Sequence, residues 1–228
     1  MTLVTVTEKE ITNGIYIDFE GNMGMEPTLL GAYFLDSKSQ QAKLLHYVHE
    51  PRFQTAADSI QSCVFNSLDE TFETLAEMAF REKRLFFAWS SREKEVISNS
   101  ISNPKLKEFI LRHLVDSKKL SKIWKKRFHP DVNFPLITGQ GRHRLYEYAK
   151  LINYKTPNMA KPGKAGKRLR DVRKQLKNRK NEYLNLTPVA KRKWKNLLLH
   201  NEHDCKSMRE VSLEAISDLK RYRIPTAA

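Results

Sequence analysis

The sequence predicts an α/β protein in which a mixed β-sheet is flanked by helices. Three short apolar-rich segments in the first third of the chain are separated by Gly, Asn, Ser and Pro residues, which is typical of consecutive strands. A segment of helical periodicity and then a continuous apolar run follow, and the rest of the chain is mainly of helical pattern. This order of elements is typical of a mixed sheet with helices on its faces.

The strands are predicted from their length, their composition and the residues that separate them. The first three span residues 14–20, 28–35 and 43–48, and we expect them to form an antiparallel meander. The fourth spans residues 85–89 (LFFAW) and is apolar without alternation, as expected for a strand that is covered on both faces. The expected sheet therefore has three antiparallel strands followed by parallel ones.

Helices are predicted where apolar residues recur at helical spacing. They span residues 69–83, 91–101, 105–114, 117–127, 143–153, 189–199 and 203–222. The helix over 189–199 begins at Thr187-Pro188, where a capping hydroxyl precedes Pro at the first helical position. Residues 155–165 contain two Pro and one Gly, so we expect a loop there.

Positive charge is concentrated in one part of the chain. The formal net charge is +15, and residues 161–195 hold fourteen Lys or Arg against two acids, a net of +12. We interpret residues 1–228 as one domain with a basic surface insertion at about 155–195. The helical stretch 166–182 has too few apolar residues to bury much of itself, so we expect it to lie on the surface or to be partly mobile.

A polyanion is the expected partner of this basic segment, because neutralising phosphates releases condensed counterions. Nucleic acid, either DNA or RNA, is therefore predicted to bind there. The alternative is a solvated helix face that only keeps the protein soluble. The candidate nucleic-acid-binding residues are Lys164, Lys167, Arg168, Arg170, Arg173, Lys174, Lys177, Arg179 and Lys180.

Two further features bear on where the protein works. The first residues lack the basic region and apolar stretch of a signal peptide, and no apolar run reaches membrane-spanning length. We therefore expect a cytoplasmic protein that does not interact with membranes. Cys63 and Cys205 give neither a disulfide framework nor the paired spacing of a zinc site, so both are expected to be reduced thiols.

Two carboxylates share one face of the first predicted strand. In residues 15–20 (IYIDFE) the strand period of two directs Asp18 and Glu20 to the same side, opposite the apolar residues that alternate with them. An exposed sheet face often carries acids, so this pair alone leaves both a functional site and an ordinary solvated face open.

Two helices also direct an acid toward the core. Glu93 shares a helical stripe with Val96 and Ile97, although Ser90-x-x-Glu93 is also a capping-box pattern that would merely satisfy backbone amides. Asp204 shares a stripe with Met208 and lies in the first turn of the helix over 203–222, where acids also favour capping and the helix dipole. Four converging carboxylates are costly to bury unless cations compensate them.

Mg²⁺ or Mn²⁺ suits such a set of oxygen ligands better than zinc does. Two such ions about 4 Å apart activate a water molecule and stabilise the leaving oxygen in an attack on phosphate. The basic segment would then hold the nucleic-acid strand beside the metal site.

The same residues resemble the motifs of a known family. Residues 16–21 (YIDFEG) look like the first motif of the DEDD exonuclease superfamily, especially its branch of predicted RNase H-like nucleases. Residues 89–94 (WSSREK) resemble the second motif, and Val115-Asp116 the short strand that often follows it. Residues 144–152 (RLYEYAKLI) are similar to the helix before the third motif, which residues 200–205 (HNEHDC) resemble. The resemblance covers residues 14–215.

The resemblance implies a ribonuclease H-like fold and hydrolysis of nucleic acid from a 3′ end with two metal ions. It implies that Asp18 bridges both ions, that Glu20 and Asp204 complete one site, and that Glu93 holds the second ion directly or through water. His200 stands where one subgroup has a Tyr that orients the attacking water, and a neutral imidazole could act there as general base.

The chain departs from the family pattern at three positions. Glu93 replaces the usual Asp, Ser90 stands where Asn is frequent, and Leu199 occupies the position five residues before the last Asp where another subgroup has its His. His200 and His203 are alternatively plain helix-start residues, and Asp116 is alternatively a helix cap.

The sequence thus predicts a 3′-5′ exonuclease acting on single-stranded DNA or RNA. Two other functions fit the same residues, namely an endonuclease on the same fold and a nucleic-acid-binding module whose catalytic site is degenerate. Tyr183 and Trp194 are the only aromatic residues within the basic segment, so backbone contacts are favoured over base stacking in each case.

Overall fold

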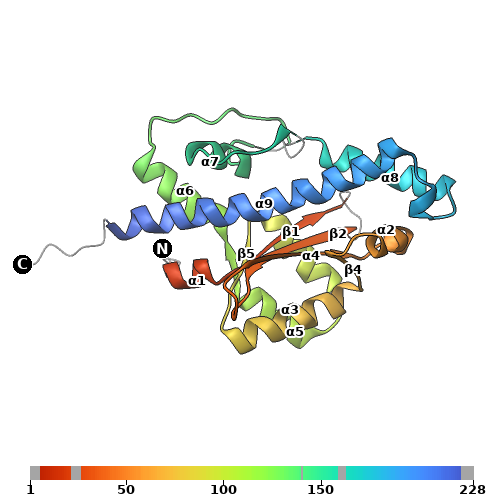
Figure 1. The fold of residues 1–228 in the computed structure, drawn as a ribbon. Coiled ribbons are helices and arrows are strands. Elements are labelled where there is room, and N and C mark those ends of the chain that lie inside the picture. The colour runs from red at the N-terminus through yellow and green to blue at the C-terminus, as the bar shows by residue number, and fades with distance from the viewer. Residues whose placement is uncertain (1–5, 22–26, 140, 159–162, 222–228) are drawn as a thin grey trace, which may run out of the picture.

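The computed structural model of the chain describes residues 6–21, 27–139, 141–158 and 163–221, and it is an α/β structure. A six-stranded mixed sheet lies at its centre, with the strand order β4-β3-β2-β1-β5-β6 (Figure 1). The strands are β1 (Ile15–Glu20), β2 (Leu29–Leu35), β3 (Ala42–Val48), β4 (Cys63–Phe65), β5 (Phe86–Ala88) and β6 (Leu114–Asp116).

The strand directions confirm the expected mixed sheet. The first three strands pair antiparallel, and β5 and β6 then continue the sheet parallel to β1. The short β4 pairs parallel to β3 at the opposite edge and was not predicted, because three residues of half-exposed, mixed character give little periodic signal.

Helices cover both faces of the sheet. On one face, α3 (Leu68–Glu82), α4 (Ser91–Ser100) and α5 (Pro104–Arg112) pack against the apolar residues of β1, among them Ile15, Ile17 and Phe19. On the other face, α9 (Pro188–Arg221) crosses β1 and β2 and packs with α1 (Glu8–Thr12), α6 (Ser117–Phe128) and α7 (Leu145–Leu151) (Figure 1). The alternation of β1 therefore directs Asp18 and Glu20 toward the α9 face.

The C-terminal helix differs from the prediction. Residues 188–221 form one 34-residue helix, where two helices were expected with a break near residue 200. Neither Pro nor Gly occurs between residues 189 and 221, so nothing in the backbone interrupts the helix. The polar residues 200–204 suggested a boundary, but Asn201 is fully buried and His200 nearly so.

The basic stretch is also more deeply integrated than expected. It forms α8 (Ala165–Asn178), whose Leu169, Val172 and Leu176 are fully buried. Together with Trp194 of α9 they belong to a third apolar cluster, which also includes Leu29 at the start of β2. The prediction that this stretch buries little of itself was wrong, since three well-spaced apolar residues suffice when the partner helix offers large side chains.

Smaller elements complete the chain: the 3-10 helices η1 (Pro51–Phe53) and η3 (Tyr183–Asn185), and helix α2 (Gln54–Asp58). The predicted helix end at Tyr222 lies outside the described residues. Within the described part of the chain, none of the helices combines the length and the apolar character needed to cross a membrane.

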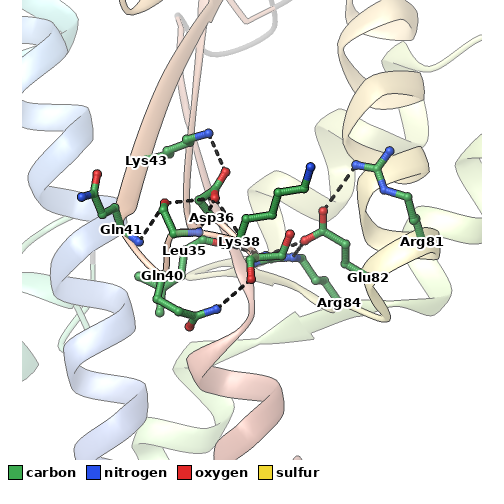
Figure 2. Close-up of polar contacts among 11 residues, drawn as sticks. Leu35, Asp36, Lys38, Gln40, Gln41, Lys43, Arg81, Glu82 and Arg84 are labelled. Carbon is green, nitrogen blue, oxygen red and sulfur yellow. Dashed lines mark hydrogen bonds and ion pairs between the residues drawn. The ribbon is translucent and has the colours of Figure 1, made fainter.

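A polar cluster fixes the end of the sheet opposite the carboxylates. Asp36 closes the β2–β3 turn by accepting bonds from the backbone amides of Lys38 and Ser39 and from Lys43 (Figure 2). The buried guanidinium of Arg84 donates to Leu35 O at the end of β2 and to Glu82 of α3 (Figure 2). The register of β1 and β2 is thus anchored far from the candidate site.

Candidate active site

The orientation of Asp18 is fixed by a residue of α9. Asn201 Nδ2 lies 2.8 Å from Asp18 Oδ2 and 2.9 Å from Asp18 O, and donates to both. The strand register places Gly31 of β2 directly opposite Asp18. A Cβ atom at Gly31 would lie 1.8 Å from Asn201 Oδ1, so only glycine leaves room for this side chain.

Three side chains converge beside Asp18. Glu20 ends β1, and His200 and Asp204 lie one helical turn apart on α9. His200 Nε2 is 3.7 Å from Glu20 Oε1 and 3.4 Å from Asp204 Oδ2. One donor atom from each of the three residues lies within 4.8 Å of the others, which is a spacing that could hold a metal ion.

Glu93 forms the capping box that the sequence left open as an alternative role. Its Oε2 accepts from Ser90 N at 3.0 Å and from Ser90 Oγ at 2.8 Å. Only 4% of Glu93 is exposed, and its charge contributes to the raised pKa values of Asp18 and Asp204. Glu93 thus caps α4 and also lies near the other carboxylates. Both are possible because α4 begins directly after β5, which pairs with β1.

The four carboxylates hold protons more tightly than isolated acids do. Burial and then the charge of the other three carboxylates raise the pKa of Asp18 well above its usual value, against the bond from Asn201. Burial raises the pKa of Glu20 to about 7, and burial followed by the charge of Glu93 raises the pKa of Asp204 to about 7. Burial also raises the pKa of Glu93. Such a cluster attracts any cation that can replace the protons.

A pocket of about 160 Å³ opens beside His200 and Asp204. Asp204 lines this pocket, and 31% of its side chain is exposed. The pocket wall combines α7 residues with α9 residues and the chain just before α8, and it includes Arg144, Tyr146, Thr156, Gly163, His203 and Ser207. The carboxylate cluster is thus accessible to a small group from outside.

The candidate nucleic-acid-binding residues, which lie in α8 and at its two ends, divide into two kinds. Arg168 is 9% exposed, and its charge lowers the pKa of Glu20 against the larger effect of burial. Arg173 donates to both oxygens of Glu50 and to Thr28 Oγ1. These two were candidates for binding nucleic acid, but they hold α8 in place. The other seven are exposed: Lys164, Lys167, Arg170, Lys174, Lys177, Arg179 and Lys180.

Three alternative roles left open by the sequence are now decided. His200 and His203 lie in the middle of α9, so their interpretation as helix-start residues is wrong, and Asp204 does not lie in a first turn. His203 Nδ1 pairs with Tyr154 OH at 2.8 Å. Asp116 caps α6 by accepting from Lys119 N at 3.0 Å, as the alternative for that residue proposed.

Sequence reasoning missed Asn201 and Gly31. Asn201 lies between two residues of the third motif, but its role depends on α9 crossing β1. The role of Gly31 depends on the strand register. Neither arrangement leaves a local signal, although a Gly inside a predicted strand is a known sign of close approach by another segment.

Comparison of the chain with known protein families, with curated proteins and with solved structures finds no match in any of the three.

Proposed function

We propose that this protein is a metal-dependent nuclease that hydrolyses phosphodiester bonds of single-stranded DNA or RNA. The observation that carries the proposal is the convergence of Asp18, Glu20, Glu93 and Asp204, whose pKa values are all raised by shared burial and, for three of them, by one another's charge. Burying several carboxylates together costs free energy, and bound cations would offset this cost by neutralising the negative charge.

The donor set fits magnesium or manganese. Carboxylate oxygens predominate, with a single imidazole beside them, and neither cysteine contributes a donor to the cluster that the described residues form. The charges of Asp204, Glu20 and Glu93 all act on Asp18, which suits the roles that the DEDD resemblance implies for these residues. We infer that Asp18 would bridge two ions, Glu20 and Asp204 would complete one site, and Glu93 would support the second.

The residues of the chain divide the work of hydrolysis. Two bound cations would supply Lewis acidity at the attacking water and at the leaving oxygen. Asn201 holds the Asp18 carboxylate in one orientation. His200 Nε2, between Glu20 and Asp204, is placed to accept the proton of a water molecule held at those carboxylates.

The fold and the charge distribution support the same function. Three antiparallel strands followed by parallel strands, with helices on both faces, are consistent with a ribonuclease H-like fold. Gly163, which lines the pocket, directly precedes Lys164, so the seven exposed cations of residues 164–180, four of them in α8, begin at its rim. A strand bound along α8 would therefore reach the carboxylates with its end.

The test is cleavage of end-labelled single-stranded DNA and RNA with Mg²⁺, with Mn²⁺ and with EDTA. We expect a metal-dependent ladder that starts at the 3′ end and is abolished by Asp18→Ala. Equal cleavage by Asp18→Ala and the parent protein would refute the proposed site. Internal cuts that depend on Asp18 would identify an endonuclease on the same fold.

One observation favours a second candidate, a nucleic-acid-binding module without activity. Glu93 Oε2 is already committed to capping α4, which leaves this residue less freedom to hold an ion. Binding without cleavage under every metal condition, with the same affinity in Asp18→Ala, would identify the protein as such a module.

A further inference from the structure

A second basic surface lies on α6. This helix carries six cationic residues and no acid between Ser117 and Phe128. Its buried face consists of Ser117, Leu120, Ser121 and Trp124, and it packs against α9, where Trp124 Nε1 donates to Asp218 Oδ2 at 2.8 Å. The cationic side chains are therefore directed away from α9. Lys119, Lys122 and Lys126 are exposed.

Three lysines of α6 line a pocket of about 440 Å³. It is lined by Lys122, Ile123, Lys125, Lys126, Pro130 and His143. The floor is partly apolar, since 43% of Ile123 is exposed. The pocket has a positive electrostatic potential. Its effect is seen at His143, whose pKa is lowered by burial and then by the charges of Lys122, Lys118 and Lys125. An anion with some apolar surface matches this combination of charge and shape.

The start of α7 lies between the α6 pocket and the pocket beside the carboxylates. His143 lines the α6 pocket and Arg144, the next residue, lines the other, so the start of α7 forms the wall between them. Hydrogen bonds to α9 show that α8, the segment after α7 and α6 follow one another along this helix. Arg168 of α8 bonds to Asn196, Tyr154 to His203, and Trp124 of α6 to Asp218. Figure 1 likewise shows α8 and α6 along opposite halves of α9.

The separation can be expressed in nucleotides. Asp204 of the carboxylate cluster and Asp218, which accepts a bond from Trp124 of α6, lie about 21 Å apart along the axis of α9, at 1.5 Å per residue. This distance separates the cluster from the place where α6 packs on α9. A stacked strand advances about 3.4 Å per nucleotide, so about six nucleotides span this distance. A pocket of about 160 Å³ at the carboxylates is smaller than the usual ligand pocket and suits one end of a single strand.

We propose that the α6 pocket binds the phosphate backbone of a single-stranded substrate about six nucleotides from the bond at the carboxylate cluster. This inference rests on the proposed nuclease function. The strand would pass from the cluster over the start of α7 to Lys122, Lys125 and Lys126. Nucleic acid is favoured over other anions because the surface continues the path from the candidate site, and because the apolar floor offers a contact for a base.

The test is binding of fluorescent oligonucleotides of four and twelve nucleotides in EDTA, as a function of salt. Lys122→Ala with Lys126→Ala is the test variant, and Lys105→Ala with Lys107→Ala on α5, across the sheet, is the control with the same charge change. We expect the α6 variant to weaken twelve-nucleotide binding and to reduce its logarithmic salt slope by about 1.4, at about 0.7 per lost phosphate contact. The slope for the four-nucleotide strand should not change.

Binding in EDTA separates this inference from the proposed function. Equal affinity and slope of the α6 and α5 variants for the long strand would overturn the inference even if the protein cleaves nucleic acid. If the α6 variant has a reduced salt slope but the parent protein cleaves no nucleic acid, α6 binds nucleic acid and the proposed nuclease function is wrong. Loss of binding to phosphatidylserine vesicles, with oligonucleotide binding retained, would instead identify α6 as a membrane-binding surface. Thermal unfolding and Lys122→Gln with Lys126→Gln control for misfolding.

Discussion

Asn201 connects the C-terminal helix α9 to strand β1 through a single side chain. Its Nδ2 donates to Asp18 Oδ2 and Asp18 O, and its Oδ1 is buried close to Gly31 without a hydrogen-bond partner among the described residues. A buried acceptor of this kind is costly, so the position is a compromise between stability and the orientation of Asp18. Asn201 is therefore a positioning residue for the proposed reaction.

Replacing either partner of this arrangement should weaken metal binding more than it weakens folding. Asn201→Leu removes the bond to Asp18, and loss of such an outer partner typically costs about 10–100-fold in metal affinity. Gly31→Ala displaces Asn201 and should have a similar effect. Mn²⁺ titration checks this, with Ala32→Gly on the same strand as control for backbone changes. Unchanged Mn²⁺ affinity in Asn201→Leu would show that Asn201 does not position Asp18.

At the scale of single residues, the sequence predicted the placement of the carboxylates in β1 but not the residues that hold them. The period of two in β1 was sufficient to place Asp18 and Glu20 on one face, and the structure directs both toward α9. Asn201 and Gly31 come into contact only because α9 crosses β2, which depends on the packing of the whole sheet. Local patterns do not contain that information.

Helix α9 carries much of what the sequence could not specify. It is about 51 Å long at 1.5 Å per residue, and it contacts α1, α6, α7, α8, β1 and β2. The polar residues 200–204 suggested a break between two helices because they interrupt the apolar stripe. They remain helical because their polar groups find partners on β1 and near α7, such as Asp18 and Tyr154.

The two kinds of cation on α8 should separate in experiments. Arg173→Ala removes the bonds to Glu50 and Thr28 and should lower the free energy of unfolding by about 1–3 kcal/mol, because Glu50 loses its closest charged partner in a half-buried place. Lys174→Ala, the exposed neighbour, should leave stability within about 0.5 kcal/mol of the parent value. Urea unfolding measures both values.

Nucleic-acid binding should show the reverse order for these residues. Lys167→Ala with Lys174→Ala should flatten the salt dependence of binding, whereas Arg173→Ala should not change its slope. If Arg173→Ala flattens the slope as much as the lysine pair does, Arg173 contacts phosphate and its pairing with Glu50 is not maintained in the complex.

The carboxylate cluster should make the stability of the whole metal-free protein depend on pH. Glu20 and Asp204, with pKa values of about 7, keep protons in the folded state that the unfolded chain releases near pH 4 to 4.5. The folded state therefore binds more protons, and its stability falls as the pH rises through 7. Buried His46 and His49, with pKa values lowered to about 4, act in the opposite direction, but only below about pH 6.5.

Between pH 6.5 and 8.5 in EDTA, we expect the Tm to fall by at least about 3 °C. Glu20→Gln should reduce this fall, because the amide cannot ionise, and Mg²⁺ or Mn²⁺ should raise the Tm more at pH 8.5 than at pH 6.5, because cations compete with protons for the same oxygens. Scanning calorimetry provides the measurement. A Tm that is constant or rises over this range in EDTA would contradict the raised pKa values.

At the scale of the molecule, the mixed sheet and the helices on its faces were predictable, but strand β4 and the packing of the basic helix α8 were not. The strand order and the covering of both faces agree with the expected mixed sheet. The third apolar cluster, in which Leu169 and Val172 of the basic helix pack with Trp194, was hidden by the high charge around these residues. Their spacing is helical, but two or three apolar residues are enough to pack a helix only when the partner helix offers a large side chain such as Trp194.

The central claim is that the four carboxylates form a two-cation site, and calorimetric titration of the metal-free protein with Mn²⁺ at pH 8 tests it most directly. We expect two Mn²⁺ ions to bind per chain, and Asp18→Asn, which preserves the shape of the side chain and removes its charge, to abolish binding of both. Thermal unfolding of the variant shows whether it is folded. Two ions bound equally well by folded Asp18→Asn, or no Mn²⁺ bound by the parent protein, would contradict the claim.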